Sequence, residues 1–245
     1  MSELKLSLTS LGKKVGTITY GHNLPVFSYK EDNSSMYEFL SCLCDFYLKK
    51  IDILLVLTET LLQRLPSVDF FDNYLKFEIG QDYNFNELAQ KFTNLGYSRC
   101  DMVSKKGEFS IRGDIVDVYP INAELPIRLD FFGDGLEKIT EFDIDSMQSV
   151  YEVNEECFVY PATFYAGQNF KKVKQLFDDE IKKIKLTNEN SYKVNDIVST
   201  YLVKFENNIF NINDSFILPF FNFNKNILNL FDEKIISDFI PRFWT

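Results

Sequence analysis

The sequence has 245 residues, of which 45% are hydrophobic, so it can bury a sizeable core in one large domain or two to three small ones. Its net charge of −10 and isoelectric point near 4.7 argue against the whole chain being a nucleic-acid binder, because a phosphate backbone is neutralised by clustered Lys and Arg. No apolar run approaches the ~18 residues of a membrane span, and the N-terminus lacks a signal-peptide pattern. We therefore expect a cytoplasmic protein that does not enter a membrane.

An abbreviated α/β domain is expected over residues 1–73. Residues 15–20 form the best strand candidate in an N-terminal stretch of otherwise short alternating pieces. A helix is expected over residues 36–49, capped by one of the two serines before it, and a short helix follows Thr58 or Thr60. The continuous apolar run over residues 51–57 predicts a strand buried on both faces.

A β-rich domain is expected over residues 74–161. Asn84, followed three residues later by Glu87, predicts the start of a helix, and Gly96 predicts its end in a left-handed conformation. Strands are expected around this helix and after the central meander, at residues 75–79, 97–103 and 149–153, and residues 158–161 are expected to close the domain.

The centre of this domain, residues 107–142, is predicted to be a three-strand antiparallel meander with a bulge at Gly113. Alternation places Arg112 on one side of its strand, opposite Phe109 and Ile111. In the next strand Arg128, Asp130 and Phe132 alternate with the apolar residues Ile127, Leu129 and Phe131. A large aromatic residue on a face with arginines is typical of protein interfaces, so function is expected on this face.

A helical segment that packs back on the first domain is expected over residues 162–245. Apolar residues recur at helical spacing from 170 to 184 and again over residues 192–205. The lysines of the first helix alternate with acidic residues and are interpreted as a solvated face rather than a nucleic-acid contact.

Patterns for catalysis and metal binding are weak. The cysteines have no C-x-x-C spacing and lie far from the single histidine: Cys42, Cys44, Cys100, Cys157 and His22. We expect no metal site, and small buried or half-buried thiols in a reducing compartment. No phosphate-binding loop or catalytic triad is found, and acidic pairs such as Asp114 with Asp117 are expected to be solvated, so no catalytic residue is predicted.

Several segments resemble the UvrB-homology module of bacterial transcription-repair coupling factor (Mfd). They are LGYSR at 95–99, GEFSIRGDIVDVYP at 107–120, LPIRLDFF at 125–132, and EFD at 141–143 with Gln148-Ser149. The resemblance extends back through residues 52–56 and 61–66, and more loosely forward to residues 218–221 and 230–232. UvrB shares the fold, but these segments are closer to the coupling factor, and the DNA-clamping hairpin of UvrB is missing.

The resemblance implies a non-enzymatic module that binds UvrA by mimicking UvrB and recruits excision repair to stalled RNA polymerase. The contact positions of the family fall on Arg112, Arg128 and Phe132. The alternative for Phe132 is packing at the edge of the core. The alternative for each arginine is an intramolecular ion pair, with Glu108, Asp114 or Asp130.

The helicase motor and the polymerase-binding domain of the family are not matched, so we expect a fragment or a reduced homologue. The resemblance then implies no cofactor, because ATP would be used by the absent motor, and contacts with RNA polymerase and DNA only through domains not present in this chain. Two other interpretations stay open: an ATP-using, DNA-engaging protein of the UvrB kind, and a purely structural domain.

Overall fold

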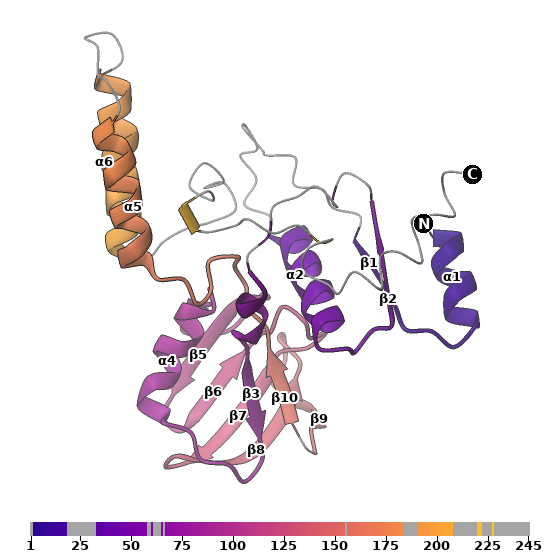
Figure 1. The fold of residues 1–245 in the computed structure, drawn as a ribbon. Coiled ribbons are helices and arrows are strands. Elements are labelled where there is room, and N and C mark those ends of the chain that lie inside the picture. The colour runs from indigo at the N-terminus through magenta and orange to yellow at the C-terminus, as the bar shows by residue number, and fades with distance from the viewer. Residues whose placement is uncertain are drawn as a thin grey trace, which may run out of the picture. The chain divides into compact units, whose positions relative to one another are not determined.

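A computed structural model describes residues 2–18, 33–57, 60, 65, 67–154, 156–183, 191–207, 220, 221 and 227 (Figure 1). They fall into two compact units. The first contains the described residues of 1–21, 31–63 and 68–167, and the second those of 64–67 and 168–245. The α/β (α+β) class predicted from the sequence is confirmed, whereas the division into residues 1–73, 74–161 and 162–245 stays a prediction.

The first unit begins with α1 (Ser2–Ser10), where the sequence was expected to form only short alternating pieces. That expectation is wrong because the leucines of α1 recur every second residue, as in a strand, and none of them is buried. β1 (Val15–Ile18) then pairs in parallel with β2 (Ile53–Val56). Of the four β2 residues only Leu55 is buried, so the prediction of a strand buried on both faces is wrong for this two-stranded sheet.

Between these strands runs α2 (Ser34–Tyr47), whose N-cap position is Asn33. The two serines therefore lie inside the helix, and the prediction that one of them caps it is wrong. The helix buries one face, made of Met36, Phe39, Leu40, Leu43 and Cys44. The short helix expected next lies mostly outside the described residues, and a 3-10 turn, η1 (Val68–Asp72), leads into the β-rich part.

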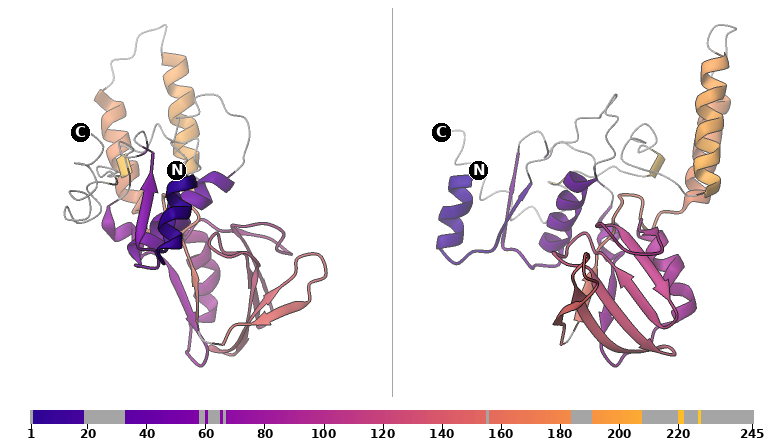
Figure 2. Two further views of the ribbon diagram at one scale, coloured as in Figure 1. Left: turned by 90° about the vertical axis from the view of Figure 1, so that its right-hand side faces the viewer. Right: turned by 180° about the vertical axis from the view of Figure 1, so that it is seen from behind.

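The β-rich part holds a six-stranded sheet of order β4-β5-β6-β7-β8-β9 (Figures 1 and 2). Its strands are β4 (Ser98–Arg99), β5 (Glu108–Arg112), β6 (Ile115–Val118), β7 (Ile127–Phe132), β8 (Gly135–Phe142) and β9 (Ser149–Glu152). The β4–β5 pair is parallel and the others are antiparallel. β3 (Leu75–Glu78) and β10 (Glu156–Val159) form a separate antiparallel pair.

Two predictions about this sheet are corrected by the structure. Gly113 is not in a bulge: Arg112 pairs with Ile115, so Gly113 and Asp114 are a two-residue hairpin turn and the meander has four strands. Gly113 has a φ of +60°, which suits the first turn position of a type II′ hairpin. The strand expected over residues 97–103 shortens to β4, because the chain loops out before β5.

α4 (Phe85–Asn94) covers one face of the sheet, which we call the inner face. Its start is as predicted, with Asn84 at the N-cap position and the Asn84 side chain donating a hydrogen bond to Glu87 at 2.8 Å. Gly96, with a φ of +91°, ends the helix in the expected left-handed conformation. The Phe92 ring stacks on Phe109 of β5 at 5.0 Å between centroids, which holds α4 against the sheet.

A buried chain of hydrogen bonds joins α2 to the β-rich part. The Tyr160 hydroxyl donates to the Asp45 carboxylate at 2.7 Å, and the Tyr97 hydroxyl donates to the Tyr160 carbonyl at 3.0 Å. The Ile121 backbone N–H donates to the Tyr97 oxygen at 3.1 Å. These bonds lie within the first compact unit and help to explain why α2 and the sheet cluster together.

The second unit contains α5 (Phe170–Lys183) and α6 (Ser191–Asn207), which lie side by side (Figures 1 and 2). Phe177 of α5 contacts the rings of Tyr201 and Phe205 on α6, at 5.9 and 5.6 Å between centroids. Both helices were predicted from their apolar spacing, and most α5 lysines are exposed, as expected for a solvated face. None of the described helices is long and apolar enough to cross a bilayer.

Candidate partner-binding surface

The three predicted contact residues lie on the face of the six-stranded sheet opposite α4. Two rows of paired residues cross four strands there: Ser110, Asp117, Arg128 and Thr140 in one, and Arg112, Ile115, Asp130 and Lys138 in the other. Phe132 follows Asp130 by two residues and so points to the same side. We call these residues the outer face.

Asp117 is the centre of the outer face. It is only 1% exposed, and its carboxylate accepts hydrogen bonds from both arginines. Arg128 donates from Nε at 2.7 Å and from a terminal nitrogen at 3.0 Å, and Arg112 donates from a terminal nitrogen at 2.5 Å. The Arg128 pair is bidentate, the geometry in which guanidinium and carboxylate bind most strongly.

Arg128 is further fixed by an aromatic ring. Its guanidinium carbon lies 4.7 Å from the ring centroid of the buried Phe142, within the range of a cation–π contact. The hydrogen bond with Asp117 raises the pKa of Arg128 above its ordinary value, so this side chain is held in its charged form.

The arginines carry more positive charge than their shared partner neutralises. Two guanidiniums oppose one carboxylate at Asp117, and only three of their ten N–H donors are used in these bonds. The Arg112 side chain is 45% exposed and the Arg128 side chain 18% exposed. The cluster can therefore offer directed donors to an anionic group on a partner.

An apolar area lies beside this charge. Phe132 is 78% exposed, an unusual position for a large aromatic side chain, and Ile115 is also exposed. Packing of Phe132 at the edge of the core, the alternative expected from the sequence, is not what the structure has. A large aromatic side chain on the same face as arginines is the composition typical of interface hot spots.

Asp117 is the residue that the sequence reasoning missed. It was expected to be solvated, but it is buried, and it takes the place of Glu108, Asp114 and Asp130 as the partner of the arginines. The signal was the two-residue turn at Gly113. Once Arg112 is paired with Ile115, Asp117 falls diagonally across from Arg112, and the separate register of β6 with β7 places it directly opposite Arg128.

No cluster of three or more potential metal ligands occurs within the part of the chain that the structure describes. The cysteines are free, with Cys44 and Cys157 buried and Cys42 and Cys100 half-buried, which confirms the expectation of buried or half-buried thiols. Burial raises the pKa of Cys157 to about 12 and that of Cys42 to about 11, so both thiols are protonated near neutral pH.

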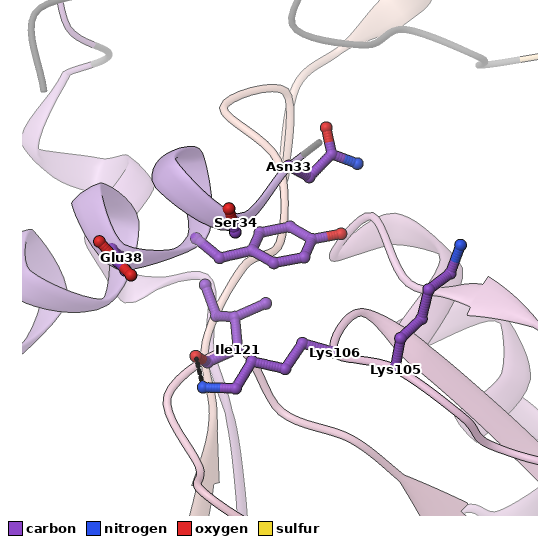
Figure 3. A pocket seen from close by; sticks show the side chains of 7 residues that line it. Asn33, Ser34, Glu38, Lys105, Lys106 and Ile121 are labelled. Carbon is purple, nitrogen blue, oxygen red and sulfur yellow. Dashed lines mark hydrogen bonds between the residues drawn. The ribbon is translucent and has the colours of Figure 1, made fainter. Parts of the chain in front are cut away.

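A pocket of about 360 Å³ lies between the start of α2 and the loop before β5 (Figure 3). Lys106 turns its ammonium group to the Ile121 carbonyl at 3.2 Å, as the dashed line in Figure 3 marks. Glu38 adds a carboxylate to the lining. With one lysine engaged and a carboxylate present, the pocket is not a strong anion site.

Comparison with known proteins finds relatives of the β-rich part. The family model of the UvrB interaction domain matches residues 75–165. The transcription-repair-coupling factor of Bacillus subtilis is 38% identical over 87 residues, which are 35% of this chain and 7% of that protein. That of Escherichia coli is 32% identical over 131 residues, or 53% and 11% of the two chains. The UvrABC system protein B of Streptomyces coelicolor is 27% identical over 99 residues, 40% and 14% of the two chains.

The chain thus spans only a small part of the length of these relatives. The matching family model describes an interaction domain rather than a catalytic one. The resemblance to transcription-repair coupling factors is confirmed, and residues 75–165 are similar to the UvrB interaction domain of DNA repair proteins.

Proposed function

We propose that the outer face is a docking surface for UvrA, and that the chain acts in transcription-coupled excision repair. The observation that carries this proposal is the exposed Phe132 on the same face as Arg112 and Arg128, most of whose N–H donors are not used in the bonds to Asp117. The match of residues 75–165 to an interaction domain supports it.

Each part of the outer face has a role in the proposed complex. Arg112 and Arg128 donate their remaining N–H groups to carboxylates of UvrA, for which a guanidinium provides two parallel donors. Phe132 enters an apolar recess and is desolvated there. The arginine bonds set the orientation of the partner, and the aromatic side chain supplies much of the affinity.

The wider role is part of the same proposal. Docking of UvrA on this surface brings the excision repair machinery to a stalled RNA polymerase. The name of the relatives, transcription-repair-coupling factor, states only that they couple transcription to repair. RNA polymerase and DNA are contacted by other domains. The chain itself is not an enzyme and binds no ATP, so adding ATP should leave its unfolding temperature unchanged.

The direct test is calorimetric titration of the chain with purified UvrA, with Arg112→Ala as the variant. We expect binding by the native chain and a loss of about 30-fold or more in affinity for the variant, the level of an interface hot spot. Affinity should also fall as salt is raised. Arg99→Ala is the matched control, because Arg99 is exposed on the same sheet but pairs with Phe109 of the inner face.

The proposal fails if the native chain does not bind UvrA, or if Arg112→Ala and Arg99→Ala bind equally well. A rise in unfolding temperature with ATP would favour a nucleotide-using repair protein instead.

A further inference from the structure

We infer that Asp117 is a positioning residue: it holds the two arginines in the geometry that docks the partner, without touching the partner itself. This inference rests on the proposed docking function and adds to it a residue that lies beneath the contact surface.

Burial separates Asp117 from any partner. At 1% exposure its carboxylate is closed off by its own neighbours, while the arginines that it binds reach the surface. Any effect of Asp117 on binding must therefore pass through Arg112 and Arg128.

The three hydrogen bonds restrict both guanidiniums before a partner arrives. Arg128 is clamped by two bonds to Asp117 and by the Phe142 ring 4.7 Å away, and Arg112 is tethered to the same carboxylate by one bond. Free arginine side chains have many rotamers, and fixing them on binding costs affinity. A surface whose arginines are already fixed avoids much of that cost.

Long-range electrostatic attraction and positioning of the arginines predict opposite changes in the affinity of Asp117→Asn for UvrA. The variant keeps the size of the side chain but removes a negative charge next to two arginines, so the cluster becomes more positive. If long-range attraction to an acidic partner decided affinity, the variant would bind more tightly. If Asp117 acts by positioning, the amide loses the bidentate charged pair and the affinity falls, by about 5-fold or more for two released arginines.

The experiment is calorimetric titration of UvrA with the full chain carrying Asp117→Asn, with thermal unfolding measured on the same samples. Glu141→Gln is the matched control. It also removes one negative charge at nearly unchanged size, but Glu141 pairs with Ile127 of the inner face and so lies outside the outer face. We expect weaker binding for Asp117→Asn and native affinity for Glu141→Gln.

A second measurement tests the positioning of the arginines on the native chain, even if Asp117→Asn does not fold. In ¹⁵N relaxation of the native chain, the Nε–H group of Arg128 should be as rigid as the backbone, and the exposed Arg99 should be mobile. Equal mobility of Arg128 and Arg99 would overturn the inference, as would unchanged or tighter binding by a folded Asp117→Asn. If the native chain did not bind UvrA, the proposed function would fail while the relaxation result still judged the positioning of the arginines.

Discussion

On the outer face, Phe132→Ala is expected to weaken binding to UvrA while leaving the stability of the fold almost unchanged. Among the described residues, Phe132 is the one phenylalanine that is largely exposed, so its truncation removes little from the core. Surface substitutions of this kind change the free energy of unfolding by about 0.5 kcal/mol or less. The unfolding temperature should therefore stay close to that of the native chain.

The effect on binding should be much larger. A phenylalanine side chain buries about 150–250 Å² when it is covered. With 78% of it exposed, roughly 120–190 Å² is left for a partner to cover, which is worth about 3–5 kcal/mol at about 25 cal/mol per Å². Ordering and imperfect fit reduce this gain, so we expect a loss of about 2 kcal/mol or more, which is about 30-fold in affinity for UvrA.

The assay is isothermal titration with UvrA at 25 °C, accompanied by thermal unfolding of each variant. Tyr151→Ala is the matched control, since Tyr151 is also an exposed aromatic residue of the sheet, but pairs with Glu141, which in turn pairs with Ile127 of the inner face. Equal losses of affinity for the two variants, or a Phe132→Ala chain that binds like the native one, would refute the reasoning.

Three further predictions concern stability. In urea titrations, the loss in free energy of unfolding should be larger for Arg128→Ala than for Arg112→Ala, and the difference should be about 1–3 kcal/mol. The reason is that only Arg128 makes a bidentate pair with the buried Asp117. Equal losses for the two variants would contradict this. Phe92→Ala should cost about 3–5 kcal/mol, since the ring is fully buried against Phe109, and chemical denaturation would measure it. Burial raises the pKa of Cys157 from its ordinary value of 9.0 to about 12, so as pH rises the unfolded chain loses this proton before the folded chain does. The free energy of unfolding should therefore fall between about pH 9 and pH 12. Urea titrations at several pH values should show a smaller fall for Cys157→Ala than for the native chain.

Substitutions of Arg112 and Arg128 change the ion pairs with the buried Asp117 as well as the contact surface. Removing Arg128 leaves a buried carboxylate with a single partner, so part of any loss in UvrA binding will come from a weakened sheet. Arg112→Ala leaves the bidentate pair intact and is the cleaner test of a direct contact. Both belong beside Phe132→Ala, which disturbs no ion pair.

Local patterns in the sequence were enough for much of the fold. Both ends of α4 were predicted because the residues that mark them, Asn84 with Glu87 at the start and Gly96 at the end, lie within one turn of the helix ends. The strands of the meander followed from side-chain alternation, and so did the side of each strand that carries Arg112, Arg128 and Phe132. These features depend on neighbours a few positions away, which a single sequence displays.

The burial of particular residues was decided by the tertiary structure. Alternation places Asp117 on the polar side of its strand, and on that side an aspartate of an acidic protein is expected to be solvated. It becomes the buried centre of the outer face because two registers coincide there: the two-residue turn at Gly113 sets β6 against β5 and brings Arg112, and the pairing of β6 with β7 brings Arg128. Phe132 stays exposed for a related reason, since it lies at the strand end on the face that α4 does not cover. The sequence by itself therefore determined which side of each strand is polar, and the register between strands decided which of those polar residues bind one another and which are left for a partner.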